Sequence, residues 1–201
     1  MTNRIQALGK KLRRVGVNLW EDPKSPVNLR PFKPGVHGRK KTRTSPYLLM
    51  LSEKQKIKLY YELSEKRLHK VFDKALKNKH TNIFDAFMGA LEITLQTFVY
   101  RMKWANSMAG ARQLVTHRHV LVDGHVLDIK SAELKPGQKV SLSDAAREFK
   151  SVLDAQQSAK VTPEYITVDS PFEGHLTRIP TFTEIPSAKV LNPKAIINLM
   201  R

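Results

Sequence analysis

A change in the spacing of apolar residues near position 120 most constrains the fold of this chain. Between positions 83 and 102, apolar residues recur every three or four positions, which is typical of the buried face of a helix. From Val120 to Leu127, two short apolar runs instead flank Asp123-Gly124, a dipeptide typical of tight β-hairpins. Helices followed by a hairpin predict an α+β fold, in which a small antiparallel sheet packs against helices.

Capping signals predict where the other helices begin. Ser52-Glu-Lys-Gln55 has the form of a capping box and predicts a helix that runs past Ala75. The apolar stripe that follows contains only one helix-weakening residue, Gly89, so a single helix is expected from about Phe84 to Met102. Ser107 is expected to cap a short helix, and residues 144–159 also have a helical pattern.

The remaining apolar runs are short and predict strands. Val140-Ser-Leu142 is expected to add a third strand to the hairpin, giving a three- or four-stranded sheet within residues 91–145. Tyr165–Val168 and Leu176–Ile179 alternate like strands near the end of the chain. The final apolar run, Ala195–Met200, fits either a strand or a helical turn.

Composition narrows the class of protein. The chain has 201 residues, 35 Lys+Arg, 18 Asp+Glu, a net charge of +17 and no cysteine. The lack of cysteine excludes disulfides, zinc ribbons, iron–sulfur clusters and cysteine nucleophiles. No stretch approaches the ~20 apolar residues of a membrane span, and the first residues lack the apolar core of a signal peptide. We therefore expect a soluble intracellular protein with no membrane partner, whose charge attracts a polyanion such as nucleic acid.

Most of this charge lies in the first part of the chain. Residues 1–90 hold 21 Lys+Arg and 7 Asp+Glu, a net charge of +14. Within them, residues 1–45 hold 12 basic and 2 acidic side chains, together with four prolines and four glycines. This composition predicts an extended basic arm with a few turns that is ordered mainly by its partner. The alternative is a flexible tail that only aids solubility.

The predicted helix from Ser52 also carries a basic face. It consists of Lys54, Lys56, Lys58, Lys66, Arg67, Lys70 and Lys74. Four acidic residues on the same segment partly balance this charge. Two interpretations of the basic face therefore stand: a face in contact with solvent, or a surface in contact with RNA.

The sequence contains no strong catalytic motif, and we expect neither an enzyme nor a bound cofactor. A phosphate-binding loop and a Gly-x-Ser-x-Gly elbow are both absent. His117-Arg118-His119 resembles a metal-binding pair, but no carboxylate or third histidine has a matching spacing, and Arg118 disfavours a cation. Contact with phosphates is the better interpretation of these residues.

RNA is favoured over DNA as the polyanion. The helix that contains Arg112 and Gln113 is followed by a hairpin, not by the second helix of a helix-turn-helix motif. Aromatic residues also lie among the basic ones, for example Trp20, Phe32 and Tyr47, and aromatics are suited to stacking on exposed bases.

The middle of the chain resembles the S-four RNA-binding domain. Ala109-Gly-Ala-Arg-Gln-Leu-Val-Thr-His117 is followed by an apolar run that ends in Asp123-Gly124, and Lys135-Pro-Gly-Gln-Lys-Val140 resembles the final turn and strand of that domain. The flanks are similar to bacterial-type small-subunit ribosomal protein S-four, on these segments: Pro34-Gly-Val-His-Gly38, Ser45-Pro-Tyr47, Glu53-Lys-Gln-Lys56, Leu91-Glu92, Val99-Tyr-Arg-Met102, Tyr165-Ile-Thr-Val-Asp169 and Arg178-Ile-Pro180. Asn18-Leu-Trp20 and residues 23–28 look most like its alphaproteobacterial branch and mitochondrial relatives.

This resemblance implies three parts. They are an extended basic arm over residues 1–45, a mostly helical domain over residues 46–90 completed by residues 151–201, and an inserted RNA-binding domain of two helices and a small antiparallel sheet over residues 91–150. The resemblance further implies a structural constituent of the small ribosomal subunit that binds the 5′ domain of its ribosomal RNA, acts early in assembly and affects translational accuracy. Expected neighbours are ribosomal protein S-five and the mRNA near the channel by which it enters. The expected location is the ribosome, with the mitochondrial matrix slightly preferred to a bacterial cytoplasm.

The resemblance and the basic pattern together indicate the RNA-binding residues. They are Lys10, Lys11, Arg13, Arg14, His37, Arg39, Lys40, Lys41, Arg43, Tyr47, Lys54, Lys56, Arg112, Gln113, His117, Arg118 and His119. Many relatives hold zinc with cysteines in the arm, and since this chain has none, no zinc is expected. Thr94 and Gln96 replace the usual Arg and Asp, which puts a polar contact there in doubt. The alternative functions are an S-four-domain RNA-binding factor and a module of an RNA-modifying enzyme, although the residues after Ala145 are too few for a catalytic domain.

Overall fold

The computed structural model describes residues 8–20, 25–40, 44–78, 81–158 and 161–200. The chain divides into two compact units. The first consists of the residues up to Ser64 and those from Ser187 onward, and the second of Glu65–Pro186. No helix within the described ranges is long and apolar enough to cross a membrane.

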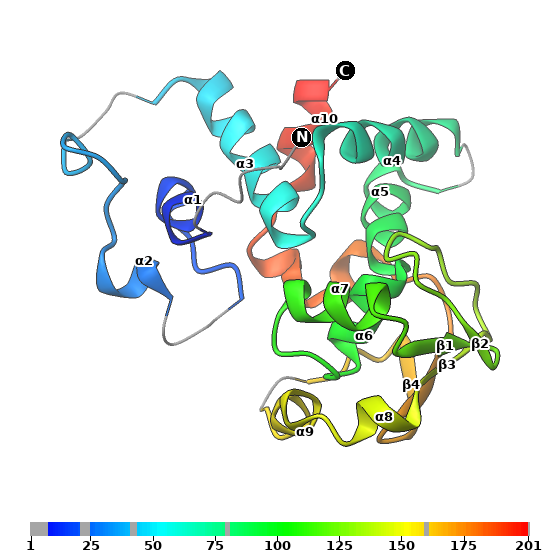
Figure 1. Cartoon of the computed structure of the whole chain (residues 1–201). Helices are drawn as coiled ribbons and strands as arrows, with labels where there is room; N and C mark the ends of the chain where they lie inside the picture. Colours follow the sequence, from blue (N-terminus) through cyan, green and yellow to red (C-terminus); the bar gives the residue numbers. More distant parts are fainter. Residues whose placement is uncertain (1–7, 21–24, 41–43, 79–80, 159–160, 201) are drawn as a thin grey trace. The chain divides into compact units, whose positions relative to one another are not determined.

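The first unit is helical (Figure 1). Its α-helices are α1 (Leu8–Val15), α2 (Pro26–Leu29), α3 (Pro46–Tyr60) and α10 (Pro193–Met200). α3 packs against α10, while α1 contacts α2 and α3. Each helix contributes apolar side chains to the interior, among them Leu12, Val27, Ile57, Tyr60, Ile196 and Ile197. The segment expected to be an extended arm therefore contains α1 and α2, and the last apolar run is a helix.

The predicted start of α3 is wrong. The helix begins at Pro46, where the Ser45 hydroxyl accepts a hydrogen bond from the Leu48 amide at 3.2 Å. Ser52 lies inside the helix and caps nothing. Proline is favoured at a first helical position because it has no amide hydrogen to leave unpaired there. Ser45-Pro46 is therefore the stronger start signal.

The helix expected to continue past Ala75 is also interrupted. α3 ends at Tyr60, and α4 (Glu65–Lys77) begins a new helix in the second unit. The turn between them has Glu62 at a φ of 51°, in the left-handed region, and the Leu63 amide donates to the Lys58 carbonyl. The lysines of α3 and those of α4 thus belong to two helices and not to the single helix that was predicted.

The second unit combines helices with one sheet. Its α-helices are α4, α5 (Ile83–Glu92), α6 (Leu95–Arg101), α7 (Met108–Thr116), α8 (Asp144–Arg147) and α9 (Lys150–Gln156), and a short 3₁₀ helix η1 (Phe182–Glu184) follows the sheet. A second 3₁₀ helix, η2 (Pro186–Lys189), leads back to the first unit. Together with the sheet, these helices give the α+β fold that the sequence predicts.

The single helix predicted from Phe84 to Met102 is two helices. α5 ends at Glu92 and α6 begins at Leu95. The amides of Leu95 and Gln96 donate to the carbonyls of Ala132 and Lys130, at 2.8 and 3.1 Å. Bonds to a distant loop therefore replace the helical ladder at this point, and periodicity alone cannot predict them.

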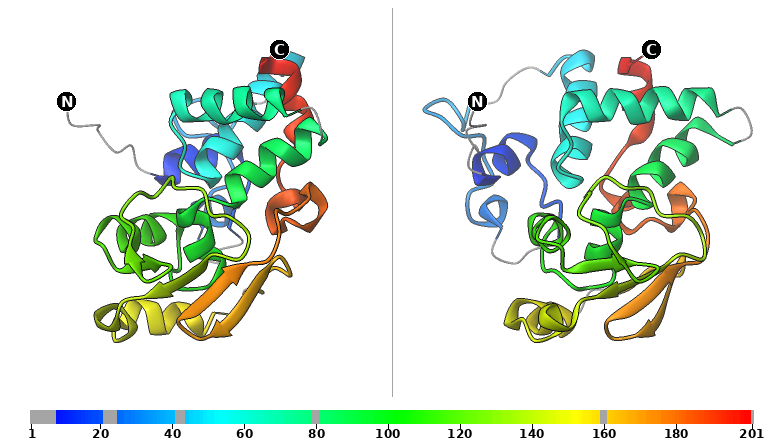
Figure 2. Two further views of the ribbon diagram at one scale, coloured as in Figure 1. Left: turned by 90° about the vertical axis from the view of Figure 1, so that its right-hand side faces the viewer. Right: turned by 45° about the vertical axis from the view of Figure 1, so that its right-hand side comes forward.

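The sheet is larger than predicted. Its strands are β1 (Val120–Val122), β2 (His125–Val126), β3 (Lys139–Leu142), β4 (Ile166–Ser170) and β5 (Glu173–Leu176), all antiparallel, in the order β2-β1-β3-β5-β4. Figure 2 shows β4 and β5 as a hairpin that extends the sheet beyond β3. The β1–β2 turn is the predicted one, with Asp123 and Gly124 at φ values of 50° and 82°.

Two boundaries in this region differ from prediction. The last strand ends at Leu176, where a strand to Ile179 was expected. The helix predicted over residues 144–159 is split into α8 and α9, with Phe149 extended between them at a ψ of 123°. The break exposes part of the Phe149 ring, which is 37% accessible.

Candidate nucleic-acid interface

In the first unit, α1 carries four of the predicted RNA-binding residues. Lys10 and Arg14 are exposed, Lys11 and Arg13 are half-buried, and Leu12 anchors the helix in the interior. Lys10 and Arg14 are four positions apart, so they lie on one side of the helix. This side presents positive charge to solvent.

Arg13 points to the following loop and helps to hold it. Its Nε donates to the Phe32 carbonyl at 3.1 Å, and its guanidinium lies 4.9 Å from the centre of the Phe32 ring. The guanidinium of Arg39 lies 4.8 Å from the same ring. We call Arg13, Phe32 and Arg39 the Phe32 cluster. It holds two predicted RNA-binding arginines on one aromatic ring, where cation–π attraction fixes their positions.

The tight turn between Phe32 and Arg39 requires glycine. A Cβ atom at Gly38 would lie 1.8 Å from the Lys33 carbonyl oxygen, so no side chain fits there. The Lys40 amide donates to the His37 carbonyl at 3.0 Å, and both side chains are exposed. The turn therefore presents His37, Arg39 and Lys40 together.

The predicted residues of α3 differ in their environment. Tyr47 is 61% exposed in the first turn of the helix. Lys54 is half-buried, and Lys56 forms a 2.6 Å ion pair with Glu53, in which the two side chains are only 14% and 20% exposed. Tyr47 is thus available for stacking, whereas Lys56 already has an anionic partner. Lys41 and Arg43 lie outside the described residues.

In the second unit, α7 places the remaining predicted residues. As predicted, Ser107 caps this helix, with its hydroxyl accepting from the Gly110 amide at 3.1 Å. Arg112 is half-buried on the helix, and Gln113 is exposed. His117 is the C-terminal cap of the helix, and its amide donates to the Gln113 carbonyl.

The chain turns sharply after α7 because Arg118 adopts a φ of 65°. Arg118 extends from this turn to Asp128, with 3.2 Å between Nε and Oδ2, and its side chain is 73% exposed. The ring of His119 meets Phe149 edge to face at 4.9 Å, and His117 and His119 lie 6.4 Å apart between ring centres. The separation of the two imidazoles follows from the turn.

These residues border an open hollow of about 400 Å³. Its lining includes Gln113, His117, His119 and Phe149, together with the buried residues Trp104 and Leu114. Arg112 and Arg118 are not among its lining residues. The hollow combines amide, imidazole and aromatic groups, which can hydrogen-bond to or stack on an unpaired base. We call it the His119 hollow.

Sequence reasoning missed Phe149 and Trp104 as members of this hollow. Trp104 is fully buried, and its indole donates to the Pro171 carbonyl at 2.9 Å, so it forms a rigid wall. Phe149 falls within the helix predicted over residues 144–159, but it lies at the break before α9. The signal that could have identified Phe149 is an aromatic residue immediately before the start of a helix.

The α+β fold of the second unit is that expected of an S4-domain protein, and comparison with known sequences agrees. Residues 4–92 match the family model described as "Ribosomal protein S4/S9 N-terminal domain", and residues 93–140 match the model described as "S4 domain". The chain is 36% identical to small ribosomal subunit protein uS4 of Acidiphilium cryptum and 38% identical to that of Phenylobacterium zucineum, each over 98% of both chains. It is 39% identical to the uS4 protein of Maricaulis maris over 92% of both chains.

The chain therefore belongs to the uS4 family of small ribosomal subunit proteins. This is a family of structural ribosomal proteins and not of enzymes. The alphaproteobacterial affinity agrees with the sequence-based prediction. The relatives are bacterial, however, so they give no support to the preference for the mitochondrial matrix.

Proposed function

We propose that this chain is a structural component of the small ribosomal subunit that binds the 5′ domain of its ribosomal RNA. The observation that carries the proposal is the His119 hollow, which lies at the end of α7 in a chain that matches uS4 proteins over nearly its whole length. Predicted RNA-binding residues line this hollow together with an exposed aromatic ring. It is suited to a base that is not stacked in a duplex.

The first unit supplies a different kind of contact. The exposed side of α1 and the turn at His37 present basic side chains to solvent, which suits contacts with phosphates. The Phe32 cluster fixes the positions of Arg13 and Arg39, and so reduces the entropy lost when RNA binds. Phosphate contacts of this kind position the protein, while contacts in the His119 hollow select the RNA.

The finer roles follow from family membership. We propose that the chain joins the 5′ region of the RNA early in assembly, lies beside ribosomal protein S-five and the channel by which mRNA enters, and affects translational accuracy through that position. The compartment proposed is the ribosome itself.

The proposal is tested by titrating the full chain against 5′-domain RNA and against an unrelated structured RNA of equal length at matched salt. We expect tighter binding to the 5′-domain RNA, and a loss of this preference in Gln113→Ala/His119→Ala. The matched control is His125→Ala, since His125 is exposed on β2 and does not line the hollow. Equal affinity of the unaltered chain for the two RNAs would refute specific binding and would favour a general RNA-binding factor.

A further inference from the structure

Helix α4 carries a row of lysines that the proposed function does not use. Lys66, Lys70 and Lys74 follow one another at intervals of four residues, and Lys77 continues the row. Lys66, Lys70 and Lys74 are about 6 Å apart along the helix axis, and Lys77 lies about 4.5 Å beyond Lys74. The longer interval is close to the step between phosphates along one nucleic-acid strand. Buried Leu68, Phe72 and other apolar residues of α4 hold this face outward.

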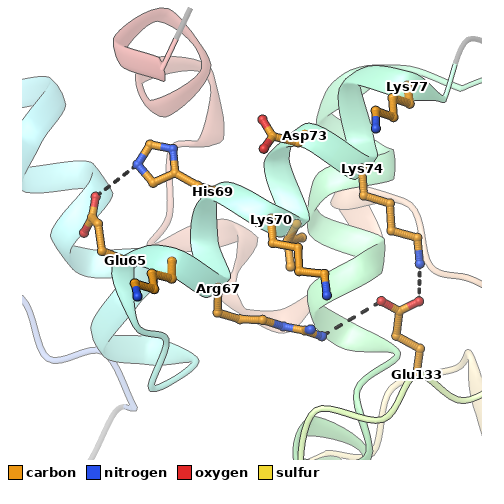
Figure 3. A pocket seen from close by; sticks show the side chains of 10 residues that line it. Glu65, Arg67, His69, Lys70, Asp73, Lys74, Lys77 and Glu133 are labelled. Carbon is orange, nitrogen blue, oxygen red and sulfur yellow. Dashed lines mark hydrogen bonds and ion pairs between the residues drawn. The ribbon is translucent and has the colours of Figure 1, made fainter.

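A groove of about 720 Å³ runs along this row (Figure 3). Its basic lining residues are Lys66, Arg67, Lys70, Lys74 and Lys77, and its acidic ones are Glu65, Asp73 and Glu133. The excess of cations over carboxylates gives the groove a net positive charge. Anions are therefore the ligands that its field attracts.

Among the described lining residues, Glu133 is the one that α4 does not supply. Its carboxylate forms an ion pair with Lys74 and lies 3.9 Å from Nη2 of Arg67. Figure 3 shows both cations pointing to this one carboxylate. Arg67 also donates to the Ser131 carbonyl at 3.1 Å, which keeps its guanidinium beside the same loop. Two converging cations around one oxyanion form an arrangement that also fits a phosphate group.

The other lysines of the row have no carboxylate partner among the residues that the structure describes. Within the described part of the chain, no ion pair with a carboxylate involves Lys66, Lys70 or Lys77. Glu65, the nearest acid in sequence, lies 3.5 Å from His69. In this groove, Glu133 therefore neutralises charge beside Arg67 and Lys74, whereas the charges of Lys66, Lys70 and Lys77 are available to a ligand.

The groove is separate from the His119 hollow. Both belong to the second unit, and their described lining residues do not overlap. A ligand in one does not occupy the other.

We propose that the α4 groove is a second RNA-binding site, which takes the phosphate backbone of one strand. Lys66 and Lys70 contact successive phosphates, the next phosphate competes with the Glu133 carboxylate for Arg67 and Lys74, and Lys77 contacts the strand beyond it. Glu133 thus weakens the site by occupying two of its cations. The identity of the RNA rests on the proposed function, whereas phosphate binding by the groove does not.

The test measures affinity against salt concentration for the full chain with a generic RNA duplex and with 5′-domain RNA. Each phosphate contact adds roughly 0.9 to the magnitude of the log–log slope on a duplex. Lys66→Gln/Lys70→Gln is expected to reduce the slope by about that amount per lysine on both RNAs. The control is Lys135→Gln/Lys150→Gln, which removes the same charge from exposed positions outside the groove.

Glu133→Gln provides a second test with the opposite sign. Freeing Arg67 and Lys74 is expected to strengthen binding and to steepen the slope, beyond the effect of Asp154→Asn, which removes an exposed carboxylate from α9. Thermal unfolding checks that each variant folds.

The inference is overturned if the lysine pair matches its control in slope, or if Glu133→Gln binds RNA no better than Asp154→Asn. Such a result would favour an acidic protein as the partner of this face. The proposed function is judged separately, by the preference for 5′-domain RNA over unrelated RNA, which changes in α4 leave intact.

Discussion

Arg101 and Glu92 form a two-point ion pair inside the second unit. Nε and Nη2 of Arg101 lie 3.0 and 2.6 Å from the two carboxylate oxygens, and the side chains are 7% and 0% exposed. The Tyr165 hydroxyl donates to the same carboxylate at 2.8 Å. The pair thus joins α5, α6 and the residue before β4, so the sheet hairpin is tied to the helices by a buried charge.

Removing the arginine is expected to destabilise the protein strongly. Arg101→Met leaves the Glu92 carboxylate buried without its cation, and breaking such a pair costs about 3–5 kcal/mol. Urea unfolding measures this loss. The double variant Glu92→Leu/Arg101→Met removes both charges and is expected to recover part of it. A single variant as stable as the unaltered chain would show that the pair is dispensable.

Replacement of Phe32 is expected to loosen the basic arm. Phe32→Leu keeps an apolar side chain but removes the ring between Arg13 and Arg39, where each exposed cation–π contact contributes about 0.5–1 kcal/mol. Limited trypsin digestion after Arg39 should accelerate roughly 5- to 30-fold for a loss of one to two kcal/mol. Phe32→Tyr should restore protection. Leu29→Ala is the control, since Leu29 is 79% exposed, and acceleration equal to that control would contradict the role of the cluster.

Arg112 is expected to contribute to RNA affinity from α7. A hydrogen bond to a charged group contributes about 1.5–3 kcal/mol, so Arg112→Ala should weaken binding to 5′-domain RNA roughly tenfold to a hundredfold. Filter binding measures the affinity. Arg118→Ala provides a comparison, since that arginine already pairs with Asp128. Unchanged affinity together with an unchanged melting temperature would make Arg112 an ordinary helix side chain.

Glu184 is expected to make stability depend on pH. The Arg178 guanidinium at 2.6 Å, and then the Thr181 amide at 3.1 Å, hold the pKa of Glu184 below its usual value of 4.5. Because the folded pKa is lowered, this stabilisation is present above the unfolded pKa and is lost as pH falls through the folded pKa.

Glu184→Gln keeps the capping-box geometry and removes only the charge. The unaltered chain should melt at a higher temperature than this variant at pH 7. The difference should shrink as the pH falls below about 4. A difference in melting temperature that stays constant down to pH 3 would contradict the ionic origin. Asp154→Asn serves as the control, since Asp154 is exposed on α9.

Local signals predicted those elements that depend on local chemistry. The Asp123-Gly124 turn is fixed by two residues that tolerate positive φ, and Ser107 caps its helix through a hydroxyl three residues before the amide it accepts from. The motif at the end of α7 also singled out His117 and His119, and both line the His119 hollow, while their contact with RNA stays a prediction.

Features set by distant partners were not predictable in this way. The break before α6 depends on the carbonyls of Lys130 and Ala132, more than thirty residues later in the chain. Lys74 and Arg67 of α4 are positioned by Glu133, and the helical pattern of α4 gives no indication of this partner. Phe149 became part of the hollow because two short helices replaced one. Tertiary contacts determine each of these three features.

Sedimentation of the chain with ribosomal subunits tests the central claim most directly. The tagged chain is expressed in its source cells, and the extract is washed in high salt before it is separated on a sucrose gradient. The account predicts that the chain stays in the small-subunit peak, together with the small-subunit ribosomal RNA. Release into the top fractions with loosely bound factors, while other small-subunit proteins remain in the peak, would contradict it.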